Sequence, residues 1–446
     1  ALSKSGDPDG ACFAFDRFLG GLPSGLQLFS LLRANPHLLD LLATILGTAP
    51  RLAQELSRHP KLFDAVIEPD FFTSLPAEDD ISAGIAAATP KALSVEDVLE
   101  RARVFGKEQM FRIGVQVLAQ TVGPAEAGAA HSRLADGLIA RLLRAVGREV
   151  EARHGPVPGG RTAVLAMGKL GGREMAPNSD LDLILIYDHD SAAEASTGPK
   201  PLSVSQYYAR LTQRLIAAFS APTSEGVLYD VDMRLRPSGN QGPVASHVGT
   251  FATYHLDNAW TWERLALTRA RVVTGPPGLR KAIEAAIRAA LTSPRDDEPT
   301  RADIVDMRRQ LLAQFGSRGV WDLKHAPGGL VDIEFIAQGL QILHASRDPA
   351  ILDPNTAQAL LKLAQAGYLK PVEAETLRRA CDLYHRLTQL LRLCVSGAFV
   401  PDTAPHELRR LVAAAAAVPD LPAAESLLAD TQAEVRELFA ALIGKV

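Results

Sequence analysis

The chain of 446 residues carries a net charge of −4, and 47% of its residues are hydrophobic; this length predicts two or three domains, and the apolar fraction is ample for packed cores. The net charge disfavours a nucleic-acid partner, because proteins that bind DNA or RNA usually carry a basic patch or stripe. No apolar run approaches the ~20 residues of a membrane span and no signal peptide opens the chain, so we expect no membrane partner.

Residues 1–94 are expected to form a helical region. Apolar positions recur at helical spacing from Leu26 to Ile67, and a proline after Asn35 and another after Ala49 mark breaks between helices. This pattern predicts a small helical bundle. The segment 69–90 is rich in proline, acidic and small residues, and we expect it to be a connecting loop with little regular structure.

Helical spacing continues in 95–155, where it predicts two amphipathic helices at 95–122 and 131–154. Alanine, leucine and arginine recur at the same spacing toward the C-terminus, so 299–446 is expected to be a helical bundle domain. The predicted fold class is therefore α+β and predominantly helical, with a small mixed sheet between the helical parts.

The region 156–298 is expected to hold this sheet. Short apolar runs predict strands at 163–167 and 181–187. A helix at 203–219 separates the second strand from a further strand-like segment at 227–236.

Three glycines, Gly168, Gly171 and Gly172, follow the first predicted strand directly. Glycines permit a tight turn whose backbone N–H groups can face phosphate oxygens with no Cβ in the way. The pattern is neither the P-loop, which ends in Gly-Lys-Ser/Thr, nor the three-glycine dinucleotide fingerprint. The glycines alone therefore do not define the ligand.

Two aspartates, Asp180 and Asp182, stand at the start of the second predicted strand. Side chains alternate along a strand, so both carboxylates should project from one face, about 7 Å apart. Magnesium prefers a few carboxylates together with phosphate oxygens and water. An isolated pair of this kind is usually a solvated turn, but the preceding glycine turn and a later acidic strand predict a magnesium and nucleoside triphosphate site, as in nucleotidyltransferases.

The segment 227–236 supplies the candidates for a third metal ligand. In a regular strand its charged residues share one face and its apolar residues share the other. The charged set is Asp230, Asp232, Arg234 and Arg236, and the apolar set is Tyr229, Val231, Met233 and Leu235. Either aspartate of the charged set could reach the pair.

A second polar cluster lies in 322–335, at the beginning of an expected helix. It consists of Lys324, Gly328, Gly329, Asp332 and Glu334. Carboxylates in a first helical turn commonly do no more than stabilise the helix dipole. This interpretation stays open beside a role at the nucleotide site.

Four longer strings resemble the family of bifunctional glutamine synthetase adenylyltransferase/adenylyl-removing enzymes, within the DNA polymerase β-like nucleotidyltransferase superfamily. They are G-K-L-G-G-R-E from Gly168, Y-D-V-D-M-R-L-R-P-S-G from Tyr229, A-W-T-W-E-R-L-A-L-T-R-A-R-V-V from Ala259 and D-L-K-H-A-P-G-G-L-V-D-I-E-F from Asp322. The resemblance extends from about residue 7 to about residue 411.

The resemblance implies a polymerase β-like nucleotidyltransferase core at 156–298, flanked by helical bundles, with 1–94 as a regulatory linker. The family has two similar halves, and this chain holds one copy of each motif, so we expect a fragment. The turn 237–239, the segment 259–263 and the opening helices resemble the half that transfers AMP from ATP to a tyrosine of glutamine synthetase, releasing pyrophosphate and lowering its activity in nitrogen regulation.

The resemblance also implies roles for individual residues. We expect Asp180, Asp182 and Asp232 to be catalytic and to hold two Mg²⁺ ions, with ATP as the substrate. The expected nucleotide contacts are Lys169, Gly171, Gly172, Arg173, Ser179, Arg234, Lys324 and Glu334. For Lys169 and Arg173 a solvated surface position is an equal alternative.

Two further interpretations remain open. Trp260, Trp262 and Glu263 either line the nucleotide cleft or pack against the core, and the packing role is favoured. The chain could also be the adenylyl-removing half, which uses orthophosphate, or an inactive regulatory module that binds glutamine synthetase or PII. The PII signalling protein and glutamine are the expected effectors, and the three cysteines, which lack metal-ligand spacing, indicate a reduced, cytoplasmic protein.

Overall fold

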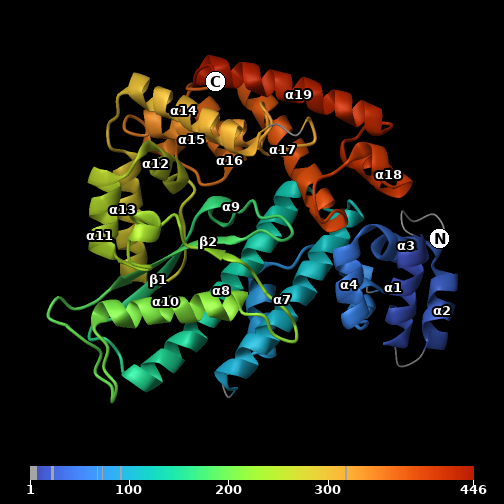
Figure 1. Cartoon of the computed structure of the whole chain (residues 1–446), viewed down its shortest axis with the longest axis horizontal. Helices are drawn as coiled ribbons and strands as arrows, with labels where there is room; N and C mark the ends of the chain where they lie inside the picture. Colours follow the sequence, from blue (N-terminus) through green and yellow to red (C-terminus); the bar gives the residue numbers. More distant parts are fainter. Residues whose placement is uncertain (1–7, 22–24, 68, 73, 91–92, 317–318) are drawn as a thin grey trace.

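The structure is a computed structural model that describes residues 8–21, 25–67, 69–72, 74–90, 93–316 and 319–446. Helices dominate it, and a small mixed sheet lies among them, so the predicted α+β class is confirmed (Figure 1). Within these ranges, every helix is too short or too polar to cross a membrane. The first seven residues of the predicted linker region lie outside the described residues.

The N-terminal part is helical, as predicted. Its helices are α1 (Pro8–Gly20), α2 (Gly25–Ala34), α3 (Pro36–Thr48), α4 (Pro50–Arg58), α5 (Leu62–Ile67) and α6 (Glu78–Ala88). The predicted breaks are confirmed, because prolines begin α3 and α4. The prediction of a loop at 69–90 is wrong. Acidic residues of this segment form the first turn of α6, where their negative charge interacts favourably with the helix dipole. Ile81 and Ile85, on one face of this helix, are buried.

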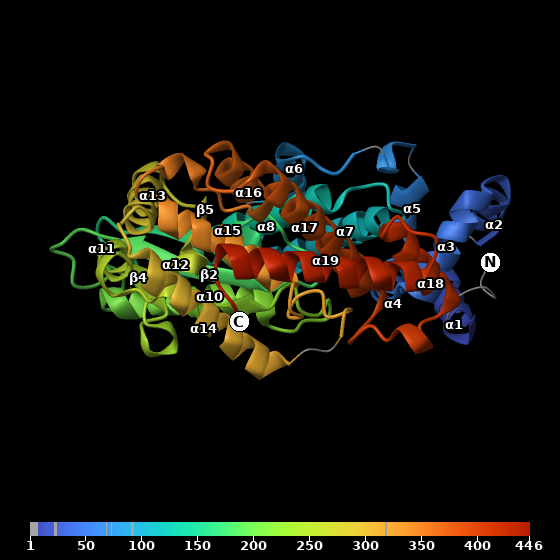
Figure 2. The same ribbon diagram turned by 90° about the horizontal axis from the view of Figure 1, so that it is seen from above.

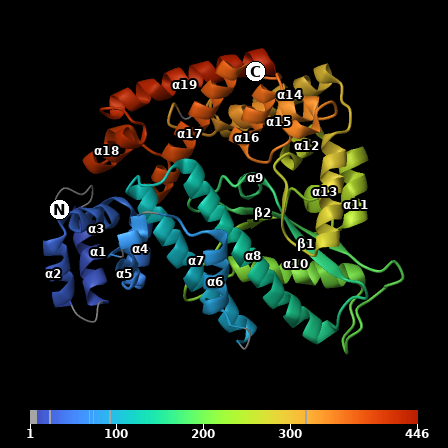
Figure 3. The same cartoon turned by 180° about the vertical axis from the view of Figure 1, so that it is seen from behind.

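Two long helices connect this part to the sheet, α7 (Val95–Leu118) and α8 (Pro124–His154). The second begins earlier than predicted, because Pro124 occupies its first turn and the Glu126 carboxylate accepts a hydrogen bond from the Gly123 N–H at 3.2 Å. With 31 residues, α8 is roughly 46 Å long. It contacts α6, α7, α10, α17 and β5, and Figure 3 shows it crossing the molecule beside α7.

The sheet has the strand order β3-β2-β1-β5, with β4 also paired to β2. The strands are β1 (Arg161–Ala166), β2 (Leu181–Asp188), β3 (Val231–Asp232), β4 (Ala245–His247) and β5 (Arg271–Thr274). The pairs β1–β2 and β1–β5 are antiparallel, whereas β3 and β4 run parallel to β2. The sheet is therefore mixed, as predicted.

The remaining helices surround the sheet and form the C-terminal part (Figure 2). Around the sheet lie α9 (Gly168–Gly171), α10 (Val204–Ser220), α11 (Val248–Thr253), α12 (Thr261–Leu267) and α13 (Pro277–Leu291). The C-terminal part holds α14 (Asp297–Phe315), α15 (Leu330–His344), α16 (Thr356–Gln365), α17 (Pro371–Cys394), α18 (His406–Ala415) and α19 (Leu421–Leu442).

Alternate residues of β1 enter two different hydrophobic cores. Ala163 and Leu165 belong to a core that continues through the C-terminal helices, whereas Val164 and Ala166 belong to a core with α8 and α10. Both faces of the central strands are thus buried, which explains why β1 and β2 appear in the sequence as continuous apolar runs. The sheet edge at the beginning of β2 is where polar side chains collect.

Candidate metal and nucleotide site

Three carboxylates meet at the beginning of β2. Asp182 on β2 lies opposite Asp232 of β3, and Asp180 immediately precedes β2. One carboxylate oxygen from each residue lies within 4.8 Å of the other two. This spacing lets all three share a cation, and a few carboxylates with room for phosphate and water oxygens are the donor set that fits Mg²⁺.

The proton affinities reflect this crowding. Burial, followed by the charges of Asp180 and Asp232, raises the pKa of Asp182 to about 6. Burial would also raise the pKa of Asp232, but hydrogen bonds from Arg234 and the charges of Arg234 and Arg236 together outweigh it, and the net shift is downward. A bound divalent cation would relieve the repulsion between the carboxylates, so the charge distribution also fits a metal.

The third carboxylate is Asp232, whereas Asp230 lies outside the group of three. The regular alternation expected for 227–236 is wrong beyond Asp232, because β3 ends there and the chain turns. Arg236, expected on the carboxylate face, is buried and donates hydrogen bonds to backbone carbonyl oxygens of the same turn. Local hydrogen bonding has replaced the strand.

Two arginines of the predicted nucleotide set lie on the surface. The Arg234 guanidinium binds the Asp232 carboxylate, with Nη2–Oδ2 at 2.6 Å and Nε–Oδ2 at 2.8 Å. Arg173 is exposed, and its charge acts on Asp136 of α8. Arg234 is therefore adjacent to the carboxylates, and the position of Arg173 fits the solvated alternative.

Gly168 abuts the metal carboxylates. Its φ is 53°, and a Cβ at this position would lie 2.1 Å from Oδ2 of Asp182. Both the conformation and the space require glycine. The turn that begins at Gly168 consequently packs directly on the acidic cluster.

The two later glycines of this turn have a different role from the expected one. The N–H groups of Gly171 and Gly172 donate to the carbonyl oxygens of Met167 and Gly168, at 2.9 and 3.1 Å, and so are already used within the turn. A Cβ on Gly171 would lie 1.8 Å from the carbonyl oxygen of Arg269, so this glycine permits close packing. The N–H groups of 168–170 donate to no acceptor in the described part of the chain, which leaves them as the candidates for a phosphate contact.

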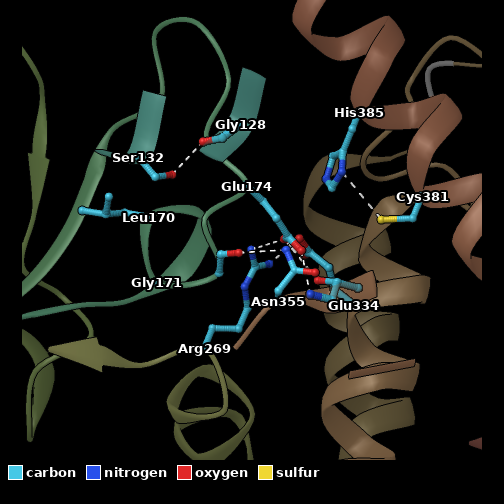
Figure 4. A network of polar contacts seen from close by, with 12 residues as sticks. Gly128, Ser132, Leu170, Gly171, Glu174, Arg269, Glu334, Asn355, Cys381 and His385 are labelled. Atoms are coloured by element: carbon cyan, nitrogen blue, oxygen red, sulfur yellow. Dashed lines mark hydrogen bonds and ion pairs between the residues drawn. The ribbon is translucent and has the colours of Figure 1, made fainter. Parts of the chain in front are cut away.

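Arg269, which follows α12, joins the glycine turn to the C-terminal helices (Figure 4). Its Nη1 donates to Oε1 of Glu334 on α15 at 2.6 Å, and its Nη2 binds the Glu174 carboxylate. Glu174 also accepts from the N–H of Thr356 at 2.6 Å and from its hydroxyl at 3.1 Å. The sheet and the C-terminal part are thus fixed to each other beside the carboxylates.

Further cations gather at this junction. Burial and then the charge of Arg392 lower the pKa of Lys169 to about 8, and Lys324 and Arg269 act in the same direction. The charges of Arg269 and Lys324 also act on Asp182. Basic groups from the glycine turn, from the segment before α15 and from α17 therefore lie near the three carboxylates, an arrangement suited to a polyphosphate.

Arg392 and Ser179 hold the loop that leads into the first carboxylate. Nη1 of Arg392 donates to the carbonyl oxygen of Pro177 at 3.2 Å and to the Ser179 hydroxyl at 3.4 Å. The buried Ser179 hydroxyl also accepts from the Ala176 N–H at 3.0 Å. The charge of Asp180 acts on Arg392. Ser179, expected at the nucleotide, is therefore engaged in supporting the loop.

The second polar cluster divides into two parts. Asp332 is buried and forms an ion pair with Arg308 of α14, so it fixes the turn rather than stabilising only the helix dipole. Gly328 has a φ of 85°, and its carbonyl oxygen accepts from the Tyr384 hydroxyl at 2.9 Å. These contacts hold the exposed Lys324 beside the site.

The packing role favoured for two tryptophans is wrong. Trp260 and Trp262 are 71% and 41% exposed, because they stand at the N-terminal end of α12, which faces outward. Glu263 is buried, and its carboxylate accepts from the Trp260 N–H at 2.9 Å and from the Tyr254 hydroxyl at 2.8 Å. It therefore caps α12.

Sequence reasoning missed Arg269, Glu174 and Arg392 as parts of the site. The first two stand inside strings quoted for the family resemblance, but no spacing rule pairs residues 95 positions apart. Arg392 lies in the last turn of the long helix α17, and no local sequence pattern marks it as part of a site. Only the tertiary contacts of Glu334 on α15 with Arg269, and of Arg392 on α17 with the loop 177–179, reveal these partners.

A glycine turn, three carboxylates gathered at the beginning of β2 and a surrounding group of cations are typical of a nucleotidyltransferase site. Consistent with this class, a family model described as glutamate-ammonia ligase adenylyltransferase matches residues 39–286. The chain belongs to this family. A second model, described as GlnD PII-uridylyltransferase, matches residues 306–443.

Curated relatives agree with the family model. The chain is 47% identical to a protein of Bradyrhizobium sp. (strain ORS 278), over 99% of this chain and 45% of the relative. It is 48% identical to proteins of Rhodopseudomonas palustris (strain TIE-1) and Xanthobacter autotrophicus (strain ATCC BAA-1158 / Py2), over 99% and 98% of this chain and 45% and 44% of the relatives. All three are named bifunctional glutamine synthetase adenylyltransferase/adenylyl-removing enzyme. The chain spans less than half the length of these relatives.

Proposed function

We propose that this chain transfers AMP from ATP to a tyrosine of glutamine synthetase and releases pyrophosphate. The observation that carries the proposal is the group Asp180, Asp182 and Asp232, whose oxygens lie within 4.8 Å of one another beside a turn with unused N–H groups. The names of the relatives support the acceptor protein. Resemblance of the strings from Tyr229 and Ala259 to the adding half supports the direction.

The three carboxylates would hold Mg²⁺, which when bound lowers the pKa of the acceptor hydroxyl, ordinarily ~10 for tyrosine, and offsets the charge of the triphosphate. The carboxylates position the α-phosphate against the hydroxyl. The N–H groups of 168–170 and the side chains of Lys169 and Lys324 bind the β- and γ-phosphates. Fixing these groups before reaction lowers the barrier, because charge develops where donors already point.

The transfer requires one bond to form and one to break. The tyrosine oxygen attacks the α-phosphorus while the bond to the bridging oxygen of pyrophosphate breaks, and the phenolic proton leaves to solvent. Attack and departure must lie in line. The Arg269 network with Glu174 and Glu334 keeps the glycine turn and the Lys324 turn at a constant separation, so both can hold one triphosphate.

As further parts of the proposal, the protein is cytoplasmic, it uses two Mg²⁺ ions, and PII and glutamine regulate it. The match of 306–443 to a model named for PII uridylylation supports a helical domain common to enzymes of nitrogen regulation. The adenylyl-removing direction and an inactive regulatory module are the alternatives that the experiment must separate.

The test is incubation of the chain with Mg²⁺, labelled ATP and glutamine synthetase, followed by mass spectrometry of the modified tyrosine. We expect transfer that depends on Mg²⁺ and is lost in Asp182→Asn. A parallel reaction supplies orthophosphate and AMP-modified glutamine synthetase with pyrophosphate removed. Rapid release of ADP there, without forward transfer, would assign the removing direction; no reaction in either assay would indicate a regulatory module.

A further inference from the structure

Three large apolar side chains are exposed on the segment 256–262, which leads into the first turn of α12. Leu256 is 44% exposed, and Trp260 and Trp262 are 71% and 41% exposed. A tryptophan that is covered buries about 150 to 250 Å², so two exposed tryptophans forgo a large hydrophobic stabilisation. Exposed apolar patches of this kind mark surfaces that a partner covers. We call these three side chains the tryptophan patch.

Two buried charged side chains hold the tryptophan patch in place from beneath. Glu263 accepts hydrogen bonds from the Trp260 N–H at 2.9 Å and from the Tyr254 hydroxyl at 2.8 Å. Arg264 donates to the carbonyl oxygen of Leu256 at 2.8 Å. The backbone that carries the exposed side chains is therefore fixed before any partner arrives, which lowers the conformational entropy that binding must remove.

An arginine without an acceptor lies beside the tryptophan patch. Arg295, between α13 and α14, is half-buried and makes no hydrogen bond or ion pair with any residue that the structure describes. Burial lowers the pKa of Arg295, and the nearby charge of Asp303 on α14 opposes this shift. Asp303 itself accepts from the hydroxyl of Thr261, which stands between the two tryptophans, and α14 packs beside α12 (Figure 1). A carboxylate on a partner would satisfy the unpaired guanidinium.

The tryptophan patch is connected to the candidate metal and nucleotide site on two sides. Along α12, Arg269 follows Trp262 by seven positions, roughly 10 Å of helix. On the other side, burial raises the pKa of Tyr254 and hydrogen bonding with Ser238, in the turn after Asp232, acts against this rise. A standard protein interface covers about 800 Å² of each partner, which is a face wider than this separation. A protein that places a hydroxyl at the carboxylates would therefore extend over the patch.

We propose that the tryptophan patch and Arg295 form the surface on which the acceptor protein docks, and that the acceptor covers it with apolar side chains and one carboxylate beside the segment that carries its tyrosine. Tryptophan and arginine are the side chains that most often dominate the binding energy of protein interfaces. The carboxylate follows from the missing acceptor of Arg295. The choice of partner rests on the proposed function, since the acceptor protein must approach the three carboxylates from outside.

The test measures binding of the whole chain to immobilised glutamine synthetase by surface plasmon resonance, without ATP or Mg²⁺. We expect the dissociation constant to rise at least tenfold in Trp260→Ala and at least fivefold in Arg295→Gln. Added salt should weaken binding of the wild type more than binding of Arg295→Gln, because salt screens the ionic contact. The matched controls are Phe13→Ala, an aromatic side chain of α1 that is 73% exposed, and Arg148→Gln, an exposed arginine of α8. Both should bind as the wild type does.

Unchanged binding in folded Trp260→Ala and Trp262→Ala, or no saturable binding by the wild type, would overturn the docking surface. Unchanged binding in folded Arg295→Gln would overturn the contact with a carboxylate. In a parallel transfer assay, weaker docking should raise KM for glutamine synthetase and leave kcat and the affinity for a non-hydrolysable ATP analogue at wild-type values. Failure of the proposed function has a different signature, which is docking by the wild type without AMP transfer, and that result would leave the docking surface standing.

Discussion

Replacing Arg269 with Ala should destabilise the protein by about 3 to 5 kcal/mol, because it leaves buried carboxylates without their cation. The side chain of Arg269 is 6% exposed, and those of Glu174 and Glu334 are 5% and 14% exposed. The loss of stability should be less than twice the loss expected from breaking one buried ion pair. Glu174 keeps its two bonds from Thr356, and Lys169 and Lys324 still act on Glu334.

The assay is urea unfolding followed by tryptophan fluorescence, with the midpoint compared at two pH values. Burial would raise the pKa of Glu334, but the charges of Arg269, Lys169 and Lys324 and a hydrogen bond from Arg269 together outweigh it and lower that pKa in the wild type. The ion pair therefore stabilises above the ordinary glutamate range and is lost as pH falls. In Arg269→Ala the unpaired Glu334 carries a penalty that grows as pH rises, so the difference between the proteins should be larger at pH 7.5 than at pH 5.

Two further variants make the result interpretable. Arg269→Lys keeps a charge but lacks the fork that reaches both carboxylates, so its stability should be intermediate. Arg269→Met combined with Glu174→Gln and Glu334→Gln removes all three charges and should recover a large part of the loss. A change below 1 kcal/mol in Arg269→Ala, or an equal change at both pH values, would refute the assigned role of the network.

Four other outcomes are expected. Asp182→Asn should reduce the rate of AMP transfer by roughly 10²- to 10³-fold while a melting curve without metal shows equal or higher stability; wild-type transfer would exclude Asp182 from catalysis. The pKa of Asp182 is raised to about 6, so protons compete with the metal for this carboxylate near and below that pH. The Mg²⁺ affinity measured by calorimetry should therefore fall about fourfold from pH 7.5 to pH 5.5 because of Asp182. An affinity that stays constant or rises would contradict the raised pKa. Lys324→Ala should weaken binding of a non-hydrolysable ATP analogue by about 1 to 3 kcal/mol, and an unchanged dissociation constant would leave Lys324 as a solvated side chain. Gly168→Ala places a Cβ against Oδ2 of Asp182 and should weaken Mg²⁺ binding at least tenfold, whereas Gly147→Ala, which meets no atom within 4 Å, should bind normally.

The sequence predicted the elements that periodicity and local signals define. Apolar runs located β1 and β2, and prolines located the beginnings of α3 and α4. The pairing of Asp180 and Asp182 followed from strand alternation alone. These features depend on neighbours within a few residues, which a single sequence displays directly.

The remaining features depend on tertiary packing. The segment after Asp232 turns because the Arg236 guanidinium binds nearby carbonyl oxygens, and alternation cannot show that competition. The acidic beginning of α6 looked like a loop because its buried face consists of only two large residues among small ones. Arg269 required the contact between α12 and α15, which no local pattern contains.

The last helix has a consequence for where the functional unit can end. Gly328, in the turn that holds Lys324, passes so close to α19 that a Cβ would lie 1.9 Å from the carbonyl oxygen of Gln432. The Gln432 side chain in turn donates to the Val320 carbonyl oxygen at 2.7 Å. The backbone of α19 near residue 432 thus packs against the turn that carries Lys324, more than one hundred positions earlier in the chain. Proteolysis or a frameshift within α19 would leave every metal carboxylate in place and still remove the support of the turn that carries Lys324. If the chain has the proposed activity, we therefore expect the smallest active piece to include α19.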